Sequence, residues 1–469
     1  MTNFDKLHEE CAIFAVSVKE KEAVGIVYNG LLALQHRGQE GAGIAAVENN
    51  KFICHKEVGL VSQVFNSEML SKMPNSNVAV GHNRYSTTGT NVKENVGPFI
   101  TEFLTGRIAT AHNGNIINAK EIKQELLALG LSFNATSDSE VIASLIGYSI
   151  MKEKDSLKGI ISATRKLKGA FSLIIASDQN QITAVRDPNG YRPLCLGSND
   201  QGMVIASESC ALDACGFKFV RDVLPGEIVV IKCGKIVYEG VELHEKDPNC
   251  GLCIFEYVYF ARPDSTIDRL NVYKARKNMG RILAEEHPAD ADIVCGVPDS
   301  GLEAAIGYSE ASNIPLKDGF VKNRYIGRSF IYPTQSQREN AVRLKLNPLA
   351  YNIKGKRIVL VDDSIVRGTT CAKIIKSLKA AGAAEVHMRI SSPPFLFTCH
   401  YGTDIDSEEN LIANKMSIDE IRDHIGADSL GYISVKGLKT ACHTSQMDFC
   451  TNCFTGDGLQ SVASKFELG

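Results

Sequence analysis

Short apolar runs separated by turn residues dominate the first half of the chain. Each run is rich in Val, Ile, Ala and Phe and has the length of a β-strand. The predicted strands are residues 11–18, 41–46, 78–81, 108–112, 171–177, 181–186, 203–207 and 227–231. Two longer stretches, at about 22–36 and 139–153, are predicted as helices. This half therefore predicts an α+β unit built mainly from antiparallel sheets.

The second half has a different pattern, in which the order strand, polar loop, helix repeats. Strands are predicted at 292–297, 356–363 and 385–391, and helices at 302–312 and 369–381. This alternation predicts an α/β unit with a parallel sheet. The charged stretch 242–249, with an Asp-Pro pair at 247–248, is the expected boundary between the two units.

Composition and charge exclude several classes of protein. The chain has 51 Lys and Arg against 54 Asp and Glu, a formal net charge of −3, without basic blocks, so a nucleic-acid partner is not expected. No run approaches the ~18 apolar residues of a membrane-spanning helix, and the polar N-terminus does not resemble a secretory signal. We therefore expect no membrane association and a cytoplasmic location. In that reducing compartment, some of the 14 cysteines are expected to bind metal or act in catalysis.

The segment 359–370, Val-Leu-Val-Asp-Asp-Ser-Ile-Val-Arg-Gly-Thr-Thr, joins an apolar strand to a helix through a polar loop. Backbone N–H groups at the start of such a helix suit a phosphate. The two acids are expected to bind ribose hydroxyls, directly or through a divalent cation. The segment resembles the phosphoribosyl pyrophosphate (PRPP) motif of type I phosphoribosyltransferases. The residues implied for PRPP are Asp362, Asp363, Ser364, Arg367, Gly368, Thr369 and Thr370.

Two further segments suit the same ligand. The loop 296–301, Gly-Val-Pro-Asp-Ser-Gly, also follows a predicted strand and precedes a helix. It could hold the pyrophosphate and, through Ser300, help to bind Mg²⁺. The basic segment 322–347 is expected to form a lid that excludes water from a reactive sugar cation.

Five features in the first half carry a second resemblance. Cys11 begins the first strand, and four polar strings follow in the order 35–40, 81–87, 111–115 and 137–140. Together they resemble the N-terminal-nucleophile glutaminase domain of class II glutamine amidotransferases. The resemblance implies that residues 1–10 are a propeptide and that the bond before Cys11 is cut. A free α-amine with a pKa of about 7.7–8.0 can then act as base toward its own thiol.

The resemblance also implies a role for each matching residue. Cys11 attacks the side-chain carbonyl of glutamine, and the Asn113 side chain with the Gly114 N–H forms the oxyanion hole. Arg84 binds the α-carboxylate of glutamine, and Asp138 binds its α-amine. Opposite charges at the two ends of the substrate would select glutamine over other amides.

A C-x-x-C pair, Cys450 and Cys453, lies near the C-terminus, with Cys253 and Cys399 as candidates to complete a four-cysteine site. Spacing alone leaves zinc, a redox pair and coincidence open. Glutaminase followed by phosphoribosyltransferase resembles, over nearly the whole chain, the glutamine PRPP amidotransferase family. The iron–sulfur branch of that family has cysteines at these four positions, which implies one [4Fe–4S] cluster per subunit with a structural role.

This resemblance implies the whole reaction. Ammonia released from glutamine attacks C1 of PRPP, pyrophosphate leaves, and 5-phosphoribosylamine forms as the first committed step of purine synthesis. One Mg²⁺ per subunit is expected on Ser300, Asp362 and Asp363, with purine nucleotides as feedback inhibitors and a homotetramer as the assembly. The expected divisions are a propeptide at 1–10, a glutaminase domain at 11–240, and a transferase domain with its cluster-binding tail at 255–469.

Two alternatives compete with this interpretation. Glucosamine-6-phosphate-type amidotransferases share the glutaminase half, but sugar-isomerase domains follow it, and the 362–370 motif is foreign to them. Some proteins with the phosphoribosyltransferase fold bind PRPP as a signal and regulate genes. Such a regulator does not need the glutaminase residues Cys11, Arg84, Asn113 and Asp138. The near-neutral net charge also gives no indication of a basic surface that would bind DNA.

Overall fold

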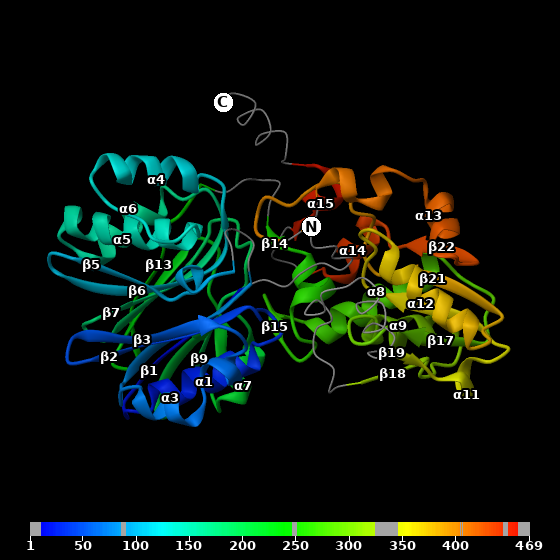
Figure 1. The fold of residues 1–469 in the computed structure, drawn as a ribbon, viewed down its shortest axis with the longest axis horizontal. Helices are drawn as coiled ribbons and strands as arrows, with labels where there is room; N and C mark the ends of the chain where they lie inside the picture. The colour runs from blue at the N-terminus through cyan, green and yellow to red at the C-terminus, as the bar shows by residue number, and fades with distance from the viewer. Residues whose placement is uncertain are drawn as a thin grey trace.

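The computed structural model describes residues 11–85, 91–245, 251–323, 346–403, 405, 407–443 and 449–457. The expected propeptide and most of the expected lid lie outside these residues. The chain forms two parts that lie side by side (Figure 1). None of the helices within the described residues has the length and apolar character needed to cross a membrane.

The N-terminal part contains two antiparallel sheets. The first has the order β11 (Lys218–Asp222), β9 (Cys195–Asn199), β10 (Gly202–Ala206), β1 (Ala12–Val18), β4 (Val78–Arg84), β2 (Gly41–Glu48) and β3 (Lys51–Val58). The second has the order β13 (Lys235–Val241), β12 (Glu227–Lys232), β8 (Gln181–Arg186), β7 (Gly169–Ser177), β6 (Gly106–Ile116) and β5 (Phe99–Phe103).

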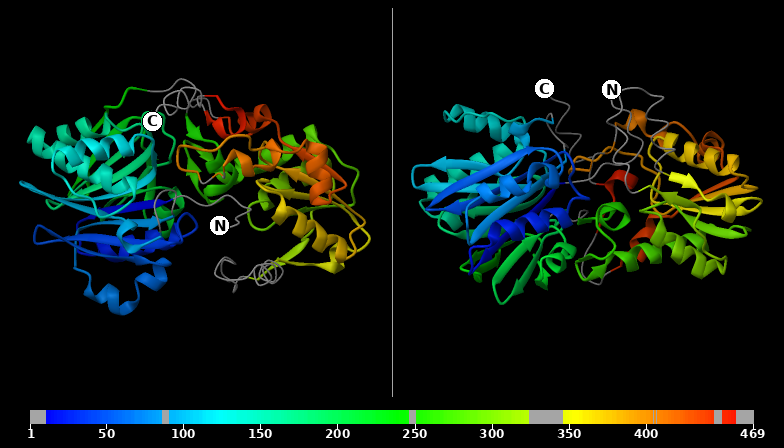
Figure 2. Two further views of the ribbon diagram at one scale, coloured as in Figure 1. Left: turned by 45° about the horizontal axis from the view of Figure 1, so that its top comes forward. Right: turned by 60° about the horizontal axis from the view of Figure 1, so that its bottom comes forward.

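Alternating side chains explain how these sheets are layered. In β1, Ile13 and Ala15 face the second sheet, whereas Phe14 and Val16 face the helices on the opposite side. Helices therefore cover both outer faces (Figures 1 and 2). On the first sheet they are α1 (Ala23–Ala33), α2 (Val61–Val64), α3 (Ser67–Lys72) and α7 (Ser209–Ala214), and on the second α4 (Ala119–Ala128), α5 (Asp138–Glu153) and α6 (Ser156–Thr164).

The C-terminal part is built on a parallel sheet with the order β17 (Ile293–Gly296), β20 (Arg357–Asp362), β21 (Glu385–Ile390) and β22 (Ser429–Tyr432). In β20, Val359 and Val361 face one layer of helices, and Ile358 and Leu360 face the other. The first layer contains α8 (Val272–Glu286), α9 (Leu302–Ser312) and α14 (Val435–Ala441), and the second contains α12 (Thr369–Ala380) and α13 (Ile418–Ile425). The predicted fold class, α+β followed by parallel α/β, is confirmed.

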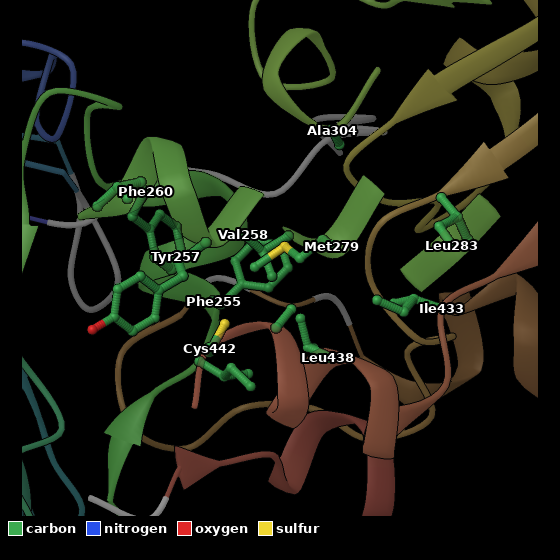
Figure 3. Close-up of a cluster of buried hydrophobic side chains, with 14 of the residues drawn as sticks. Phe255, Tyr257, Val258, Phe260, Met279, Leu283, Ala304, Ile433, Leu438 and Cys442 are labelled. Carbon is green, nitrogen blue, oxygen red and sulfur yellow. The ribbon is translucent and has the colours of Figure 1, made fainter. Parts of the chain in front are cut away.

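Smaller elements complete the fold. The π-helical turn η2 (Glu256–Phe260) buries Phe255 and Tyr257 against Met279 of α8 and Leu438 of α14 (Figure 3). The remaining elements are β14 (Leu252–Cys253) paired with β23 (Phe449–Cys450), β15 (Thr266–Ile267) with β16 (Leu270–Asn271), β18 (Phe320–Lys322) with β19 (Leu346–Pro348), the helices α11 (Ala350–Ile353) and α15 (Asn452–Thr455), and the 3₁₀ turns η1 (Lys93–Asn95), η4 (Glu408–Asn410) and η5 (Ile412–Asn414).

Two arginines of the N-terminal part are buried against acids of the C-terminal part. The Arg186 guanidinium donates two hydrogen bonds of 2.9 Å to the Asp268 carboxylate, in the turn between β15 and β16. The Arg37 guanidinium donates bonds of 2.7 and 2.8 Å to the two carboxylate oxygens of Glu256 in η2. Removing one partner of a buried ion pair costs about 3–5 kcal/mol, so these pairs fix how the two parts meet.

Candidate functional site

Cys11 lies immediately before β1, at the edge of the layer between the two N-terminal sheets. Its Sγ is 3.4 Å from the carbonyl oxygen of Tyr85 and 3.5 Å from the Tyr85 backbone nitrogen. The register of β1 and β4 pairs Ala12 with Asn83, so Cys11 lies opposite Arg84. By strand alternation, its side chain belongs to the same face as that of Ile13, toward the second sheet.

Arg84 ends β4 and is buried. Val78 and Val80 of the same strand face the layer between the sheets, and alternation puts Arg84 on that side too. Burial lowers the pKa of the Arg84 guanidinium, and the negative charges of Cys11, Glu40 and Asp138 oppose this shift. The site therefore places one cation beside a thiol and a carboxylate, as binding of a zwitterionic substrate requires.

Asn113 lies in β6, facing β1 and β4 from the second sheet. Its side chain is fully buried, and among the described residues neither its Oδ1 nor its Nδ2 has a hydrogen-bond partner. The preceding residue connects the two sheets, because the carbonyl oxygen of His112 lies 3.1 Å from Nε2 of His82 in β4. A buried amide without a hydrogen-bond partner lowers the stability of a fold by about 1–3 kcal/mol. Such a group is unusual, and this indicates that the Asn113 amide binds a ligand.

Gly114 follows with a φ of +136°, and an added Cβ would lie 2.2 Å from the carbonyl oxygen of Ala170, so only glycine fits. Gly114 pairs with Phe171 of β7, whose N–H and C=O both bond Asp187 at the end of β8. Because both polar groups of Phe171 point toward β8, the Gly114 N–H points away from β7. The Gly114 N–H is therefore not used in the ladder between β6 and β7.

Asp138 is the first residue of α5, whose N-cap is Ser137. One carboxylate oxygen accepts a 3.1 Å hydrogen bond from the Ile116 backbone N–H, and the other lies 3.8 Å from Nδ1 of His112. Burial lowers the pKa of His112, and the charge of Asp138 opposes this shift. The N-terminal end of a helix dipole favours negative charge, and this carboxylate suits an ammonium group of a ligand.

The second cluster of predicted residues lies at the carboxyl end of β20. Asp362 and Asp363 are both buried, and the Asp363 carboxylate accepts hydrogen bonds from the hydroxyls of Ser300 and Ser364. The glycine at 301 packs directly on β20, since an added Cβ would lie 2.3 Å from the Val361 carbonyl oxygen. The structure therefore brings the two loops of the sequence motifs together at one edge of the sheet.

The N-terminus of α12 faces the same edge. Gly368 caps the helix with a φ of +82°, and the helix begins at Thr369. Arg367 precedes the cap, and Thr370 lies in the first helical turn. The backbone N–H groups and the dipole of a helix start favour a phosphate at this place.

The side-chain oxygens of Asp362, Asp363 and Ser300 fit Mg²⁺, a hard cation that prefers oxygen ligands. Within the described ranges, no three His, Cys, Asp or Glu side chains converge closely enough to hold a single metal ion. Mg²⁺ is commonly held by one or two carboxylates together with substrate phosphates. Asp362, Asp363 and Ser300 are therefore enough as the ligands that the protein supplies.

Four cysteines line one small cavity: Cys253, Cys399, Cys450 and Cys453. The parallel pair β14–β23 sets Cys253 beside Cys450, and Cys453 lies in α15. Burial raises the pKa of the Cys453 thiol, and the neighbouring Cys253 and Cys399 raise it further. The set fits a [4Fe–4S] cluster, in which the four thiolates bind separate irons and need not converge on one point.

Sequence reasoning missed a buried charge network next to the nucleophile. Arg37 donates its Nε hydrogen to the Cys11 carbonyl oxygen at 3.4 Å, and its guanidinium also donates to Glu208 at 2.7 Å. Arg37, Glu208 and Glu256 have 0–1% of their surfaces exposed. The only signals in the sequence were an arginine inside the 35–40 string and an acid inside the aromatic run 255–260.

Comparisons with known proteins match a family model to each half of the chain. The glutamine amidotransferase domain model matches residues 82–214, and the phosphoribosyl transferase domain model matches residues 268–391. The amidophosphoribosyltransferase of Synechococcus elongatus is 49% identical over 458 residues, which is 96% of this chain and 92% of that protein.

Two solved structures match across the full fold. One, described as the allosteric regulatory enzyme of purine biosynthesis, has a TM-score of 0.87 at 44% identity and covers 95% of both chains. The other is the glutamine PRPP amidotransferase of Bacillus subtilis complexed with ADP and GMP, with a TM-score of 0.86 at 44% identity, covering 95% of this chain and 96% of that one. The chain belongs to the amidophosphoribosyltransferase family.

Proposed function

We propose that this chain performs the amidophosphoribosyltransferase reaction with Cys11 as the glutamine-cleaving nucleophile. The observation that carries the proposal is the buried amide of Asn113, which has no hydrogen-bond partner among the described residues and faces the sheet that presents Cys11 and Arg84. The Cys11 thiolate adds to the side-chain carbonyl of glutamine, and the amide of Asn113 and the N–H of Gly114 stabilise the oxyanion. One such donor contributes about 3–4 kcal/mol to transition-state stabilisation.

Arg84 and Asp138 hold the two charged ends of glutamine. Ammonia leaves, and the substrate's acyl group remains on Cys11 as a thioester. Water then hydrolyses this thioester, which releases glutamate and restores the thiol. The α-amine of Cys11 serves as the base, which requires removal of residues 1–10. We accordingly propose residues 11–240 as the glutaminase domain and residues 255–469 as the transferase domain with its cluster-binding tail.

In the transferase half, PRPP binds at the carboxyl end of β20. The N–H groups around Thr369 and Thr370 hold the 5-phosphate, with Ser364, Arg367 and Gly368 in the same loop. Asp362 and Asp363 hold the ribose hydroxyls. Asp362, Asp363 and Ser300 would hold Mg²⁺, which when bound neutralises the charge of the pyrophosphate. Ammonia displaces pyrophosphate at C1, giving 5-phosphoribosylamine.

The remaining expectations are proposals of the same kind. Cys253, Cys399, Cys450 and Cys453 hold one [4Fe–4S] cluster that ties the C-terminal tail to the transferase half. Cysteines must stay reduced to bind such a cluster as thiolates, and this requirement favours a reducing compartment such as the cytoplasm. The ADP and GMP bound to the Bacillus subtilis relative support purine nucleotides as inhibitors. A homotetramer is the proposed assembly.

Glutamate release should depend on PRPP. Because free ammonia escapes or is protonated unless it is used at once, we expect low glutaminase turnover alone and a rise of at least about tenfold with PRPP and Mg²⁺. Coupled detection of glutamate, with and without PRPP, measures this, and ribose 5-phosphate serves as the matched ligand lacking pyrophosphate. Equal glutamate release in all three conditions, with no phosphoribosylamine formed, would contradict the proposed function.

Loss of the cluster should destabilise the C-terminal tail. We expect Cys450→Ser to lower the iron content and the Tm of the transferase half, since β23 pairs with β14 at Cys253 and Cys450. Cys442→Ser provides a matched control, because that buried thiol lies outside the cluster cavity. Iron analysis with thermal unfolding under anaerobic conditions checks this. An unchanged Tm after complete iron loss would rule out a structural role.

A further inference from the structure

A short loop of the transferase half, residues 399–403, rests on the glutaminase half beside the oxyanion strand. The Asn115 side-chain Nδ2 donates a 2.8 Å hydrogen bond to the His400 carbonyl oxygen. The buried Arg192 donates a 2.7 Å bond from Nη2 to the Tyr401 carbonyl oxygen. The Tyr401 ring stacks on Tyr191, with 4.5 Å between ring centroids and 18° between planes. The 399–403 loop is thus fixed to the glutaminase half by three contacts, which involve the successive residues His400 and Tyr401.

The backbone at Gly402 makes the most intimate of these contacts. An added Cβ at Gly402 would lie 3.2 Å from the Gly114 carbonyl carbon, 3.3 Å from the Asn115 nitrogen and 3.1 Å from Nη2 of Arg192. Its φ of +109° also favours glycine. The loop therefore lies directly against the peptide that joins Gly114 to Asn115, and a side chain at Gly402 would force these neighbours to shift.

Gly114 needs such support from outside its own strand. It has no side chain to pack, its φ is +136°, and its N–H points away from β7. The Ala170 carbonyl and the backbone of Gly402 both lie close to Gly114 and limit its movement. A displacement of about 1 Å at a catalytic group can cost on the order of 100-fold in rate.

We infer that the 399–403 loop is a positioning element of the glutaminase reaction: Gly402, held by Tyr401 and Arg192, fixes the peptide after Gly114 so that the Gly114 N–H meets the oxyanion. The inference rests on the proposed function, in which Gly114 is an oxyanion donor. It adds that the transferase half supplies part of the glutaminase site. Movement of this loop would change the rate of glutamine cleavage without touching the thiol or the substrate clamp.

The test is Gly402→Ala in the full-length enzyme. We expect kcat of glutamine hydrolysis to fall about 10-fold to 100-fold, with KM for glutamine within about twofold, because an oxyanion donor acts only in the transition state. Ammonia-dependent phosphoribosylamine synthesis, the iron content and the rate of Cys11 alkylation by iodoacetamide should remain those of the unaltered enzyme. Gly382→Ala is the matched control, since Gly382 has a φ of +98° and lies beside Lys354 in the transferase half.

Asn115→Ala is a second variant, which tests the same contact if Gly402→Ala does not fold. It removes the hydrogen bond to His400 and should lower kcat in the same direction by a smaller factor. If both folded variants match Gly382→Ala in glutaminase kcat, the positioning role is overturned. Asn113→Ala separates this failure from that of the proposed function: it should lower glutaminase kcat on its own by about 10²–10³-fold. Retained kcat in Asn113→Ala overturns the oxyanion assignment and the positioning role with it.

Discussion

Cys11→Ala should abolish glutamine-dependent synthesis of phosphoribosylamine and leave ammonia-dependent synthesis intact. The substitution removes the only atom proposed to bond the glutamine carbonyl, whereas the PRPP site at the end of β20 lies in the other half of the chain. Loss of a hydrolase nucleophile typically costs on the order of 10⁴-fold or more in kcat. The two activities should therefore separate by several orders of magnitude in one protein.

Parallel assays with glutamine and with an ammonium salt measure the separation. Cys54→Ala is the matched control, because Cys54 is also a half-buried thiol of the first sheet, in β3. That control should keep both activities. Substantial glutamine-dependent turnover by Cys11→Ala would contradict the nucleophile assignment. Mass spectrometry of the unaltered enzyme adds an independent check, since the base in the mechanism is the amine that cleavage before Cys11 exposes.

The elements predicted from hydrophobic periodicity were those buried on at least one full face. The strands β1, β7 and β8 and the helix α9 were predicted within two residues of their ends. The strands β3 and β13 were missed because they lie at sheet edges and contain only exposed and partly buried residues, some of the exposed ones apolar. Helix α8 was missed because Arg276 and Gly280 interrupt its buried apolar face.

The sequence indicated the side chains of the two sites, but it did not indicate which distant segments pack against them. Motifs named the side chains, and strand order then brought Ser300 to Asp363, as expected for parallel strands whose loops share one edge. The contact between Asn115 and His400 joins residues 285 positions apart, and nothing in the local pattern of either segment indicates it. Periodicity reports which face of an element is buried, but it does not report which distant segment covers that face.

The largest effect on the transferase side should come from Asp363→Asn. The Asp363 carboxylate accepts hydrogen bonds from the hydroxyls of Ser300 and Ser364, so it fastens the pyrophosphate loop to the PRPP motif. The amide replaces one acceptor oxygen by a donor and removes the negative charge proposed for Mg²⁺. A buried group left with a mismatched partner costs about 1–3 kcal/mol, before any loss of the cation is counted.

We expect Asp363→Asn to lower both glutamine-dependent and ammonia-dependent synthesis by about 10²-fold or more, given that scale of mismatch and a lost charge. The slow glutaminase reaction without PRPP should persist, and PRPP should no longer stimulate it. Titration calorimetry of PRPP with Mg²⁺ measures the loss of binding directly. Asp290→Asn is the control, because that carboxylate forms an exposed ion pair with Arg357 at the opposite end of β20. If Asp363→Asn retained PRPP-stimulated glutamate release, the ligand would have to bind elsewhere, since stimulation requires that PRPP occupy the site to which ammonia is delivered.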